Sequence, residues 1–157
     1  MRRKKLKKRA YEFKLCRVAE VGQSYPVNSP ETAFDYWQTS IRTRDWFHEA
    51  KEHIVVLLLN TRYNVEGHNL VSIGSLSEAL AHPREIFAPV LCASAFGFIL
   101  MHNHPKRRPF QDRKLTQTII RGANLLQVKL VDHVIAGDPK TDEGEPFFSF
   151  KEVGMID

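Results

Sequence analysis

Two histidines separated by one residue form the part of this sequence with the clearest chemical use. They stand in His102-Asn103-His104-Pro105, directly after the apolar run of residues 98–101. Side chains two apart on an extended backbone point to the same face, so both imidazoles can reach one ion. A hydrolytic zinc site needs a third protein ligand and an open position besides such nitrogens. The pair therefore indicates a candidate metal site, with a core or capping histidine as the alternative.

Two acids are candidates for the remaining roles. Asp112 is the nearest acid after His104, and a loop of that length can return its carboxylate to the ion, although the position also suits a helix N-cap. Glu52 stands just before the strand pattern of residues 53–61, where a carboxylate at a sheet edge can face a neighbouring strand. Hydrolysis needs a base to move protons, and Glu52 is the candidate. A solvated acid beside Lys51 is the alternative.

The elements that must position these residues alternate between strand and helix patterns. Apolar or alternating runs predict strands, which cover residues 11–18, 53–61, 65–73, 98–101 and 129–137. Helical spacing predicts helices over residues 29–41, from 82 onward with a bend or restart at Pro89, and over 112–126. The alternation indicates one α/β domain with helices on the faces of a sheet.

Composition limits the class of protein further. The 157 residues are 43% hydrophobic and 26% charged, near the average for a globular domain. The longest apolar run, residues 54–59, is far shorter than the roughly 20 residues that cross a bilayer. Cys16 and Cys92 lie in apolar stretches, as reduced and packed thiols do. We therefore expect a cytoplasmic protein with no membrane segment.

The net charge of +5 is concentrated in a basic arm, residues 1–10. Seven of the 23 Lys and Arg residues fall within residues 1–9, which leaves 16 against all 18 acids in the rest of the chain, a net −2. A short basic arm can bind phosphates by releasing counterions, and a solvated tail is the alternative. Weak nucleic-acid contact through residues 1–9 is thus one expectation, whereas the charge of the body argues against a zinc-dependent nucleic-acid hydrolase. The sequence leaves the oligomeric state open.

Four segments, in their order along the chain, resemble a known family. They are VVLLLNTRYNV, SIGSLSEALAHPREIF, ILMHNHP and VDHVIAG. With the glutamate before the first of them, they resemble the JAMM (JAB/MPN) metalloprotease domain, and most closely its RadC-like subgroup. The resemblance is strongest over residues 30–157 and implies one domain over residues 11–157. The implied fold is of the JAB/MPN type, a cytidine-deaminase-like mixed sheet flanked by helices.

The resemblance also implies roles for individual residues. His102, His104 and Asp112 would hold one Zn²⁺ ion, which acidifies its bound water to a pKa of about 7. Glu52 would take that proton and pass it to the leaving nitrogen of an amide bond, peptide or isopeptide, in a peptide or protein substrate. Asp132 and His133 are expected to give structural or supporting hydrogen bonds rather than to bind the metal.

One position departs from the family pattern. The family has a serine three residues before its metal-binding aspartate, where it helps to polarise the scissile carbonyl, and this chain has Pro109. Proline offers neither a hydroxyl nor an N–H, and losing one oxyanion donor costs about 10²- to 10³-fold in other hydrolases. The loop of residues 106–111 is also short for the subgroup, and Arg107 or Arg108 could replace the donor or be plain surface charges. The alternative function is therefore a catalytically weak or inactive metal-binding module in a DNA-repair-associated complex.

Overall fold

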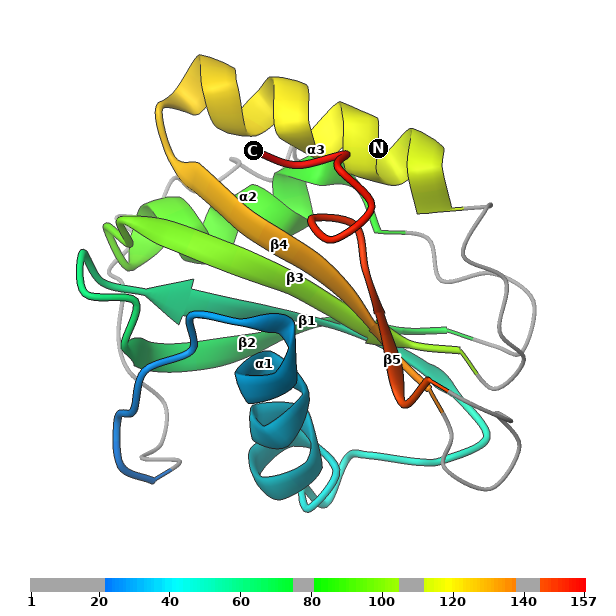
Figure 1. The fold of residues 1–157 in the computed structure, drawn as a ribbon. Coiled ribbons are helices and arrows are strands. Elements are labelled where there is room, and N and C mark those ends of the chain that lie inside the picture. The colour runs from blue at the N-terminus through cyan, green and yellow to red at the C-terminus, as the bar shows by residue number, and fades with distance from the viewer. Residues whose placement is uncertain (1–21, 75–80, 105–111, 138–144) are drawn as a thin grey trace, which may run out of the picture.

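The buried apolar run that follows Glu52 becomes the second strand from one edge of a five-stranded sheet. The computed structural model describes residues 22–74, 81–104, 112–137 and 145–157 (Figure 1). Its strands, in the spatial order β2-β1-β3-β4-β5, are β1 Glu52–Leu59, β2 Val65–Gly74, β3 Gly97–Asn103, β4 Lys129–Ala136 and β5 Phe147–Ser149. The helices are α1 Pro30–Tyr36, its π-helical continuation η1 Trp37–Ile41, α2 Pro83–Cys92 and α3 Arg113–Leu126. The basic arm and the strand predicted over residues 11–18 lie outside the described residues.

The sheet is mixed, as the family resemblance implies. β1 runs antiparallel to β2 and β3, β3 and β4 are parallel, and β5 closes the far edge antiparallel to β4. A parallel pair requires a crossover, and α3 supplies it between β3 and β4. The chain therefore passes from the end of β3 to the start of α3 at one end of the sheet.

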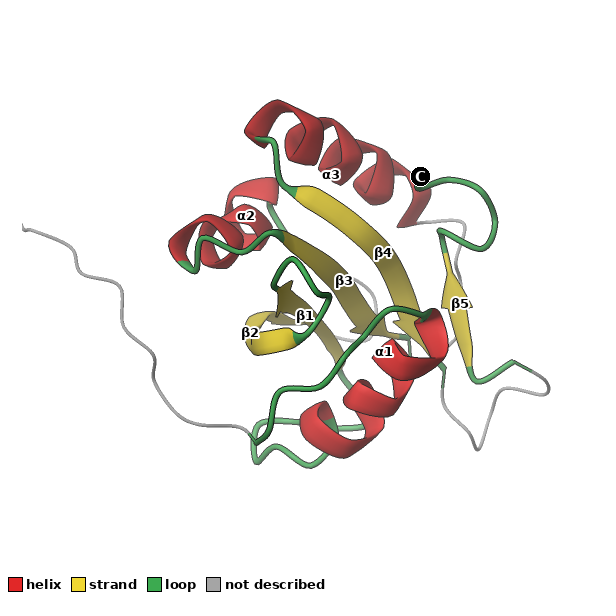
Figure 2. Ribbon diagram, turned by 60° about the vertical axis from the view of Figure 1, so that its left-hand side comes forward, coloured by secondary structure: helices red, strands yellow, loops and turns green. Residues whose placement is uncertain are grey.

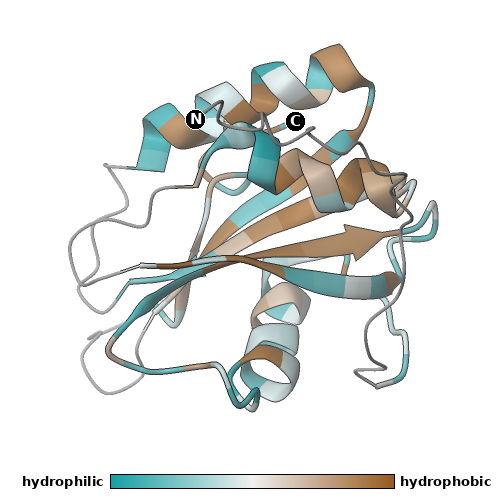
Figure 3. Ribbon diagram, turned by 180° about the vertical axis from the view of Figure 1, so that it is seen from behind, coloured by the Kyte–Doolittle hydropathy of each residue, from teal (hydrophilic) through white to brown (hydrophobic). Residues whose placement is uncertain are grey.

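Successive side chains of the central strands point to opposite faces of the sheet, and they contribute to one apolar core on each face. Val55 and Leu57 of β1 face the core beneath α1 and η1, whereas Ile54 and Val56 face the core beneath α2 and α3. Figure 2 shows α1 on one face of the sheet and α2 with α3 on the other. In Figure 3 hydrophobic residues dominate the central strands, whereas the helices carry both hydrophobic and hydrophilic ones. This is the three-layer arrangement that the sequence pattern predicts.

The helix predicted over residues 29–41 forms, whereas a restart at Pro89 and a packed Cys92 are not observed. Ser29 caps α1, because its Oγ accepts a hydrogen bond from the N–H of Thr32 at 3.3 Å. Pro89 does not restart the helix, because α2 continues through it to Cys92, and the carbonyl of Pro89 accepts the N–H of Ala93 at 2.9 Å. Cys92 is exposed rather than packed, because it falls on the outer side of the last turn of α2.

Bilayer-spanning helices are absent from the described ranges, in which every helix is too short or too polar to cross a membrane.

The close contact between β3 and β4 gives a test of the sheet register. A Cβ at Gly97 would lie 2.8 Å from the carbonyl oxygen of Lys129, so the two strands would have to move apart. We expect Gly97→Ala to lower the free energy of unfolding by about 1–3 kcal/mol. Gly67→Ala on β2 is the matched control, since its Cβ would meet nothing within 4 Å. It should leave stability unchanged or raise it by up to about 1 kcal/mol. Urea denaturation measures both, and equal effects would contradict this register.

Candidate metal centre

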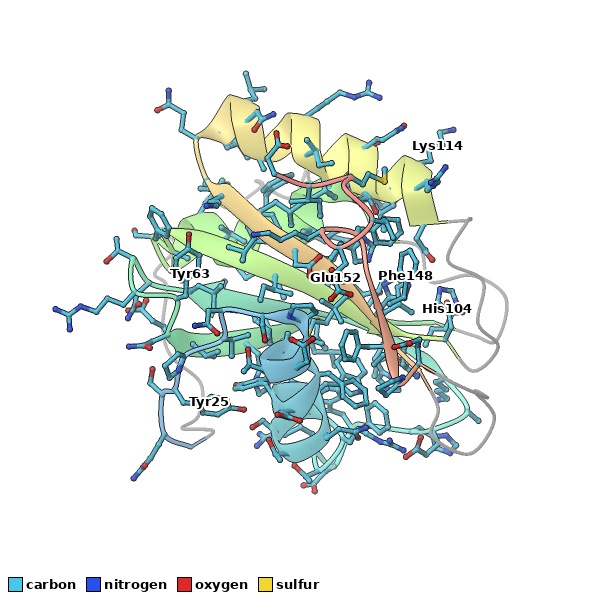
Figure 4. The ribbon with its side chains drawn as sticks, viewed as in Figure 1. Tyr25, Tyr63, His104, Lys114, Phe148 and Glu152 are labelled. Atoms are coloured by element: carbon cyan, nitrogen blue, oxygen red, sulfur yellow. The ribbon has the colours of Figure 1, made fainter. Side chains whose placement is uncertain are left out.

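The end of β3 and the start of α3 bring His102, His104 and Asp112 together. Nε2 of His104 lies 2.9 Å from Oδ2 of Asp112, and Nε2 of His102 lies 3.4 Å from the same oxygen. One ligand atom from each residue lies within 4.8 Å of the other two. The ligand atoms of a four-coordinate zinc are about 3.3 Å apart, so this spacing suits a shared ion. Figure 4 shows His104 at this end of the sheet, below the first turn of α3.

Asp112 uses its side chain for this cluster and not for its helix. It occupies the N-cap position of α3, yet the side chain makes no capping hydrogen bond. Burial works to raise the pKa of Asp112, but the hydrogen bond with His104 and the nearby imidazole of His102 outweigh burial and lower it. The carboxylate is therefore held ionised and directed toward the imidazoles, as expected of a ligand rather than of a simple N-cap.

Glu52, the first residue of β1, is buried beside the same cluster. Only 7% of it is exposed, so it is not the solvated acid of the alternative interpretation. Its Oε1 lies 3.1 Å from Nδ1 of His104, whose Nε2 faces Asp112. Burial alone would lower the pKa of His104, but the hydrogen bonds to Asp112 and Glu52 raise it to about 9. The carboxylates of Glu52 and Asp112 thus favour the positively charged form of the His104 ring that lies between them.

Asn103, between the two histidines, fixes the start of β1 to the end of β3. Its Oδ1 accepts the backbone N–H of His53 at 2.9 Å, and its Nδ2 donates to the carbonyl of Lys51 at 2.9 Å. These two residues flank Glu52 on either side, so Asn103 holds the backbone that carries the glutamate. The sequence does not predict this role, since all it indicates is that Asn103 points to the opposite face from both histidines.

His133 and Thr116 lie directly behind His102. Nε2 of His133 is 2.9 Å from Nδ1 of His102, and Nδ1 of His133 is 2.7 Å from Oγ1 of Thr116. His133 is fully buried, and this burial lowers its pKa well below the ordinary value. It therefore supports a candidate ligand by a hydrogen bond, as expected from the sequence, whereas the role of Thr116 was missed.

Asp132 ties β4 to the turn after β5. It accepts hydrogen bonds from the hydroxyl of Ser149 at 2.6 Å and from the N–H of Lys151 at 3.0 Å. Burial raises the pKa of Asp132, opposed by these hydrogen bonds. Asp132 thus has the structural role, next to His133, that the sequence predicts.

The position of the family serine, Pro109, and its neighbours Arg107 and Arg108 lie outside the described residues.

The fold and this cluster define an α/β domain of the JAB type that carries a His/His/Asp cluster able to hold a metal ion. The family model of the RadC-like JAB domain matches residues 27–155, and the chain belongs to that family. It is 35% identical over 133 residues to a UPF0758 protein of Chlorobaculum parvum, covering 83% of this chain and 55% of the relative. It is 40% identical over 109 residues to a UPF0758 protein of Rubrobacter xylanophilus, covering 68% and 45%. The chain thus spans about half the length of these relatives.

The anchoring role of Asn103 gives a prediction for stability. In Asn103→Ala the buried N–H of His53 loses its partner, and the carbonyl of Lys51 loses a donor. We expect the free energy of unfolding to fall by about 1–3 kcal/mol. Asn69→Ala, at an exposed position of β2, is the control and should stay within about 0.5 kcal/mol. If both variants unfold at the same urea concentration as the parent protein, the anchoring role is wrong.

Proposed function

We propose that this protein is a zinc-dependent metallopeptidase-type hydrolase that cleaves amide bonds, peptide or isopeptide, in a peptide or protein substrate. The observation that carries the proposal is the convergence of His102, His104 and Asp112 on one point, with Glu52 buried beside it. Membership of the RadC-like JAB family supports the same function. Because the chain spans about half of its relatives, substrate and partners are part of the proposal and not of the family assignment.

The donor set fits zinc. Two imidazole nitrogens and one carboxylate are typical of catalytic zinc sites, which keep a further position open. Nε2 of His102 is buried and has no hydrogen-bond partner among the described residues, so a cation would satisfy an atom that is costly to leave alone. Zinc in such a site acts as a Lewis acid and lowers the pKa of a coordinated water to about 7.

The protein's own residues would orient the site and move the protons. Oε1 of Glu52 accepts the Nδ1 proton of His104 and so directs Nε2 of that ring toward Asp112. The second oxygen of the Glu52 carboxylate is then available to take a proton and to return it to the leaving nitrogen. Burial of Glu52 keeps this exchange away from bulk water, where the carboxylate would be solvated.

The second candidate function is a metal-binding module with weak or no turnover in a DNA-repair-associated complex. Pro109 is the observation that favours it, because proline supplies no oxyanion donor where the family has a serine. Weak nucleic-acid contact through residues 1–9 and a cytoplasmic location belong to this proposal as well.

The metal assignment predicts which histidine matters for zinc content. The purified protein should hold about one zinc ion per chain, and His102→Ala should lose most of it because a donor is removed. His48→Ala is the control, since His48 is exposed and lies outside the cluster. Metal analysis after dialysis measures all three proteins. Equal zinc in both variants would remove His102 from the site.

The two candidate functions differ in what Glu52 and Pro109 do. Glu52→Gln should keep the zinc and abolish cleavage of quenched fluorescent peptides and of a lysine isopeptide substrate, because the base is lost. Pro109→Ser should raise the rate by about 10²- to 10³-fold if a missing oxyanion donor limits turnover. Cleavage that is unaffected by Glu52→Gln would overturn its assigned role. Zinc-loaded protein that is silent with and without the serine would favour the non-catalytic module.

A further inference from the structure

A series of hydrogen bonds connects the start of α3, through β4, to the candidate ligand His102 on β3. Oγ1 of Thr116 lies 2.8 Å from the backbone carbonyl oxygen of Asp112 and 2.7 Å from Nδ1 of His133. Nε2 of His133 then lies 2.9 Å from Nδ1 of His102. Each contact joins groups whose capacity to donate or accept is limited, so the direction of the whole series can be derived.

The direction is set at Thr116. A carbonyl oxygen only accepts, so the contact with Asp112 requires that the threonine hydroxyl donate its single proton to that carbonyl. The hydroxyl oxygen then has only lone pairs to offer to His133. Nδ1 of His133 must therefore carry a proton and donate it to Thr116.

The second nitrogen of His133 follows from its surroundings. The ring is 0% exposed and stacks on Phe150 with centroids 4.8 Å apart, and its two nitrogens bond Thr116 and His102, neither of which is an acid. A buried cation without a partner of opposite charge is costly, so the ring stays neutral. With its proton on Nδ1, His133 can only accept a hydrogen bond at Nε2. In the contact between the two histidines, Nδ1 of His102 must therefore carry the proton and donate it to Nε2 of His133.

We propose that Thr116 and His133 act as positioning residues that hold the proton of His102 on Nδ1, so that Nε2 is the nitrogen left to bind the metal. The inference rests on the proposed function only in taking Nε2 of His102 as a nitrogen that binds a metal ion. Nε2 of His102 is the buried atom that lacks a hydrogen-bond partner among the described residues, and it lies on the Asp112 side of the ring. Supporting hydrogen bonds of this kind commonly fix the tautomer of a metal-binding histidine.

Helix α3 supplies a matched control. Thr118 makes the same type of bond as Thr116, from its hydroxyl to a carbonyl four residues back, with Oγ1 3.0 Å from the oxygen of Lys114. It is exposed, and its only described partner is that carbonyl. Thr116→Val and Thr118→Val therefore remove equivalent local bonds, but only the first removes an acceptor from a histidine. Thr116→Ser keeps the hydroxyl and should behave as the parent protein.

The primary measurement is made without metal. Nitrogen-15 NMR of histidine side chains in the metal-free protein, at mildly alkaline pH, reports which ring nitrogen carries the proton. We expect His102 and His133 to be protonated on Nδ1 in the parent protein, in Thr116→Ser and in Thr118→Val. Thr116→Val should give a mixture of tautomers at both rings. Its zinc affinity, measured by competition with a chromophoric chelator, should be weaker by roughly 10- to 100-fold.

The proposal is overturned if His102 of the parent protein carries its proton on Nε2, a result that needs no variant to fold. It is also overturned if folded Thr116→Val keeps both tautomers and the parent affinity for zinc. Failure of the hydrolase proposal looks different. The tautomers would be as described, while the protein would bind no zinc or would bind zinc without cleaving any amide substrate.

Discussion

The pairing of β1 with β3 is the constraint on which the candidate metal centre depends. The register places Ile54 opposite His102, so that Glu52 and His104 meet just beyond the end of the ladder. Side chains alternate between faces, and a slip of one residue would turn the glutamate and both histidines toward opposite sides. The buried residues of β1 and β3 prevent such a slip, because they fill the cores on both faces. Apolar packing thus determines where the polar groups meet.

The polar interior of the described protein is concentrated around this one end of the sheet. Its buried polar and charged residues are Glu52, His53, His102, Asn103, Thr116, Asp132, His133 and Ser149. Each belongs to the candidate centre or to the hydrogen bonds that support it, whereas the remainder of the two cores is apolar. Buried polar groups stabilise a fold only when their bonds are satisfied. Their concentration here is therefore better explained by a function than by a general need of the fold.

The sequence predicts those features that depend on local pattern. A period of two places His102 and His104 on one face of a strand, and helical spacing places Asp112 at the start of α3. The apolar run after Glu52 likewise predicts β1. The meeting of these segments is a tertiary event, and its prediction came from the resemblance to a family rather than from periodicity. The prediction of a restart fails at Pro89, because the buried Ile86, Phe87 and Val90 on either side of it pack as one helix and outweigh the local preference of proline to interrupt it.

Thr116 and Asn103 could not be predicted because their roles depend on long-range neighbours. Thr116 follows Asp112 by one helical turn, which suggests only the bond to the carbonyl four residues back. Its contact with His133 exists because α3 packs on the strand that it precedes. Asn103 similarly bonds to residues about fifty positions earlier in the chain. The ligands of such a centre can be found by type and spacing, whereas the groups that fix their protons and orientation appear only once strands and helices are assembled. The packed fold therefore fixes the geometry of the candidate metal centre, whereas the local sequence supplies only the side chains that could bind the metal.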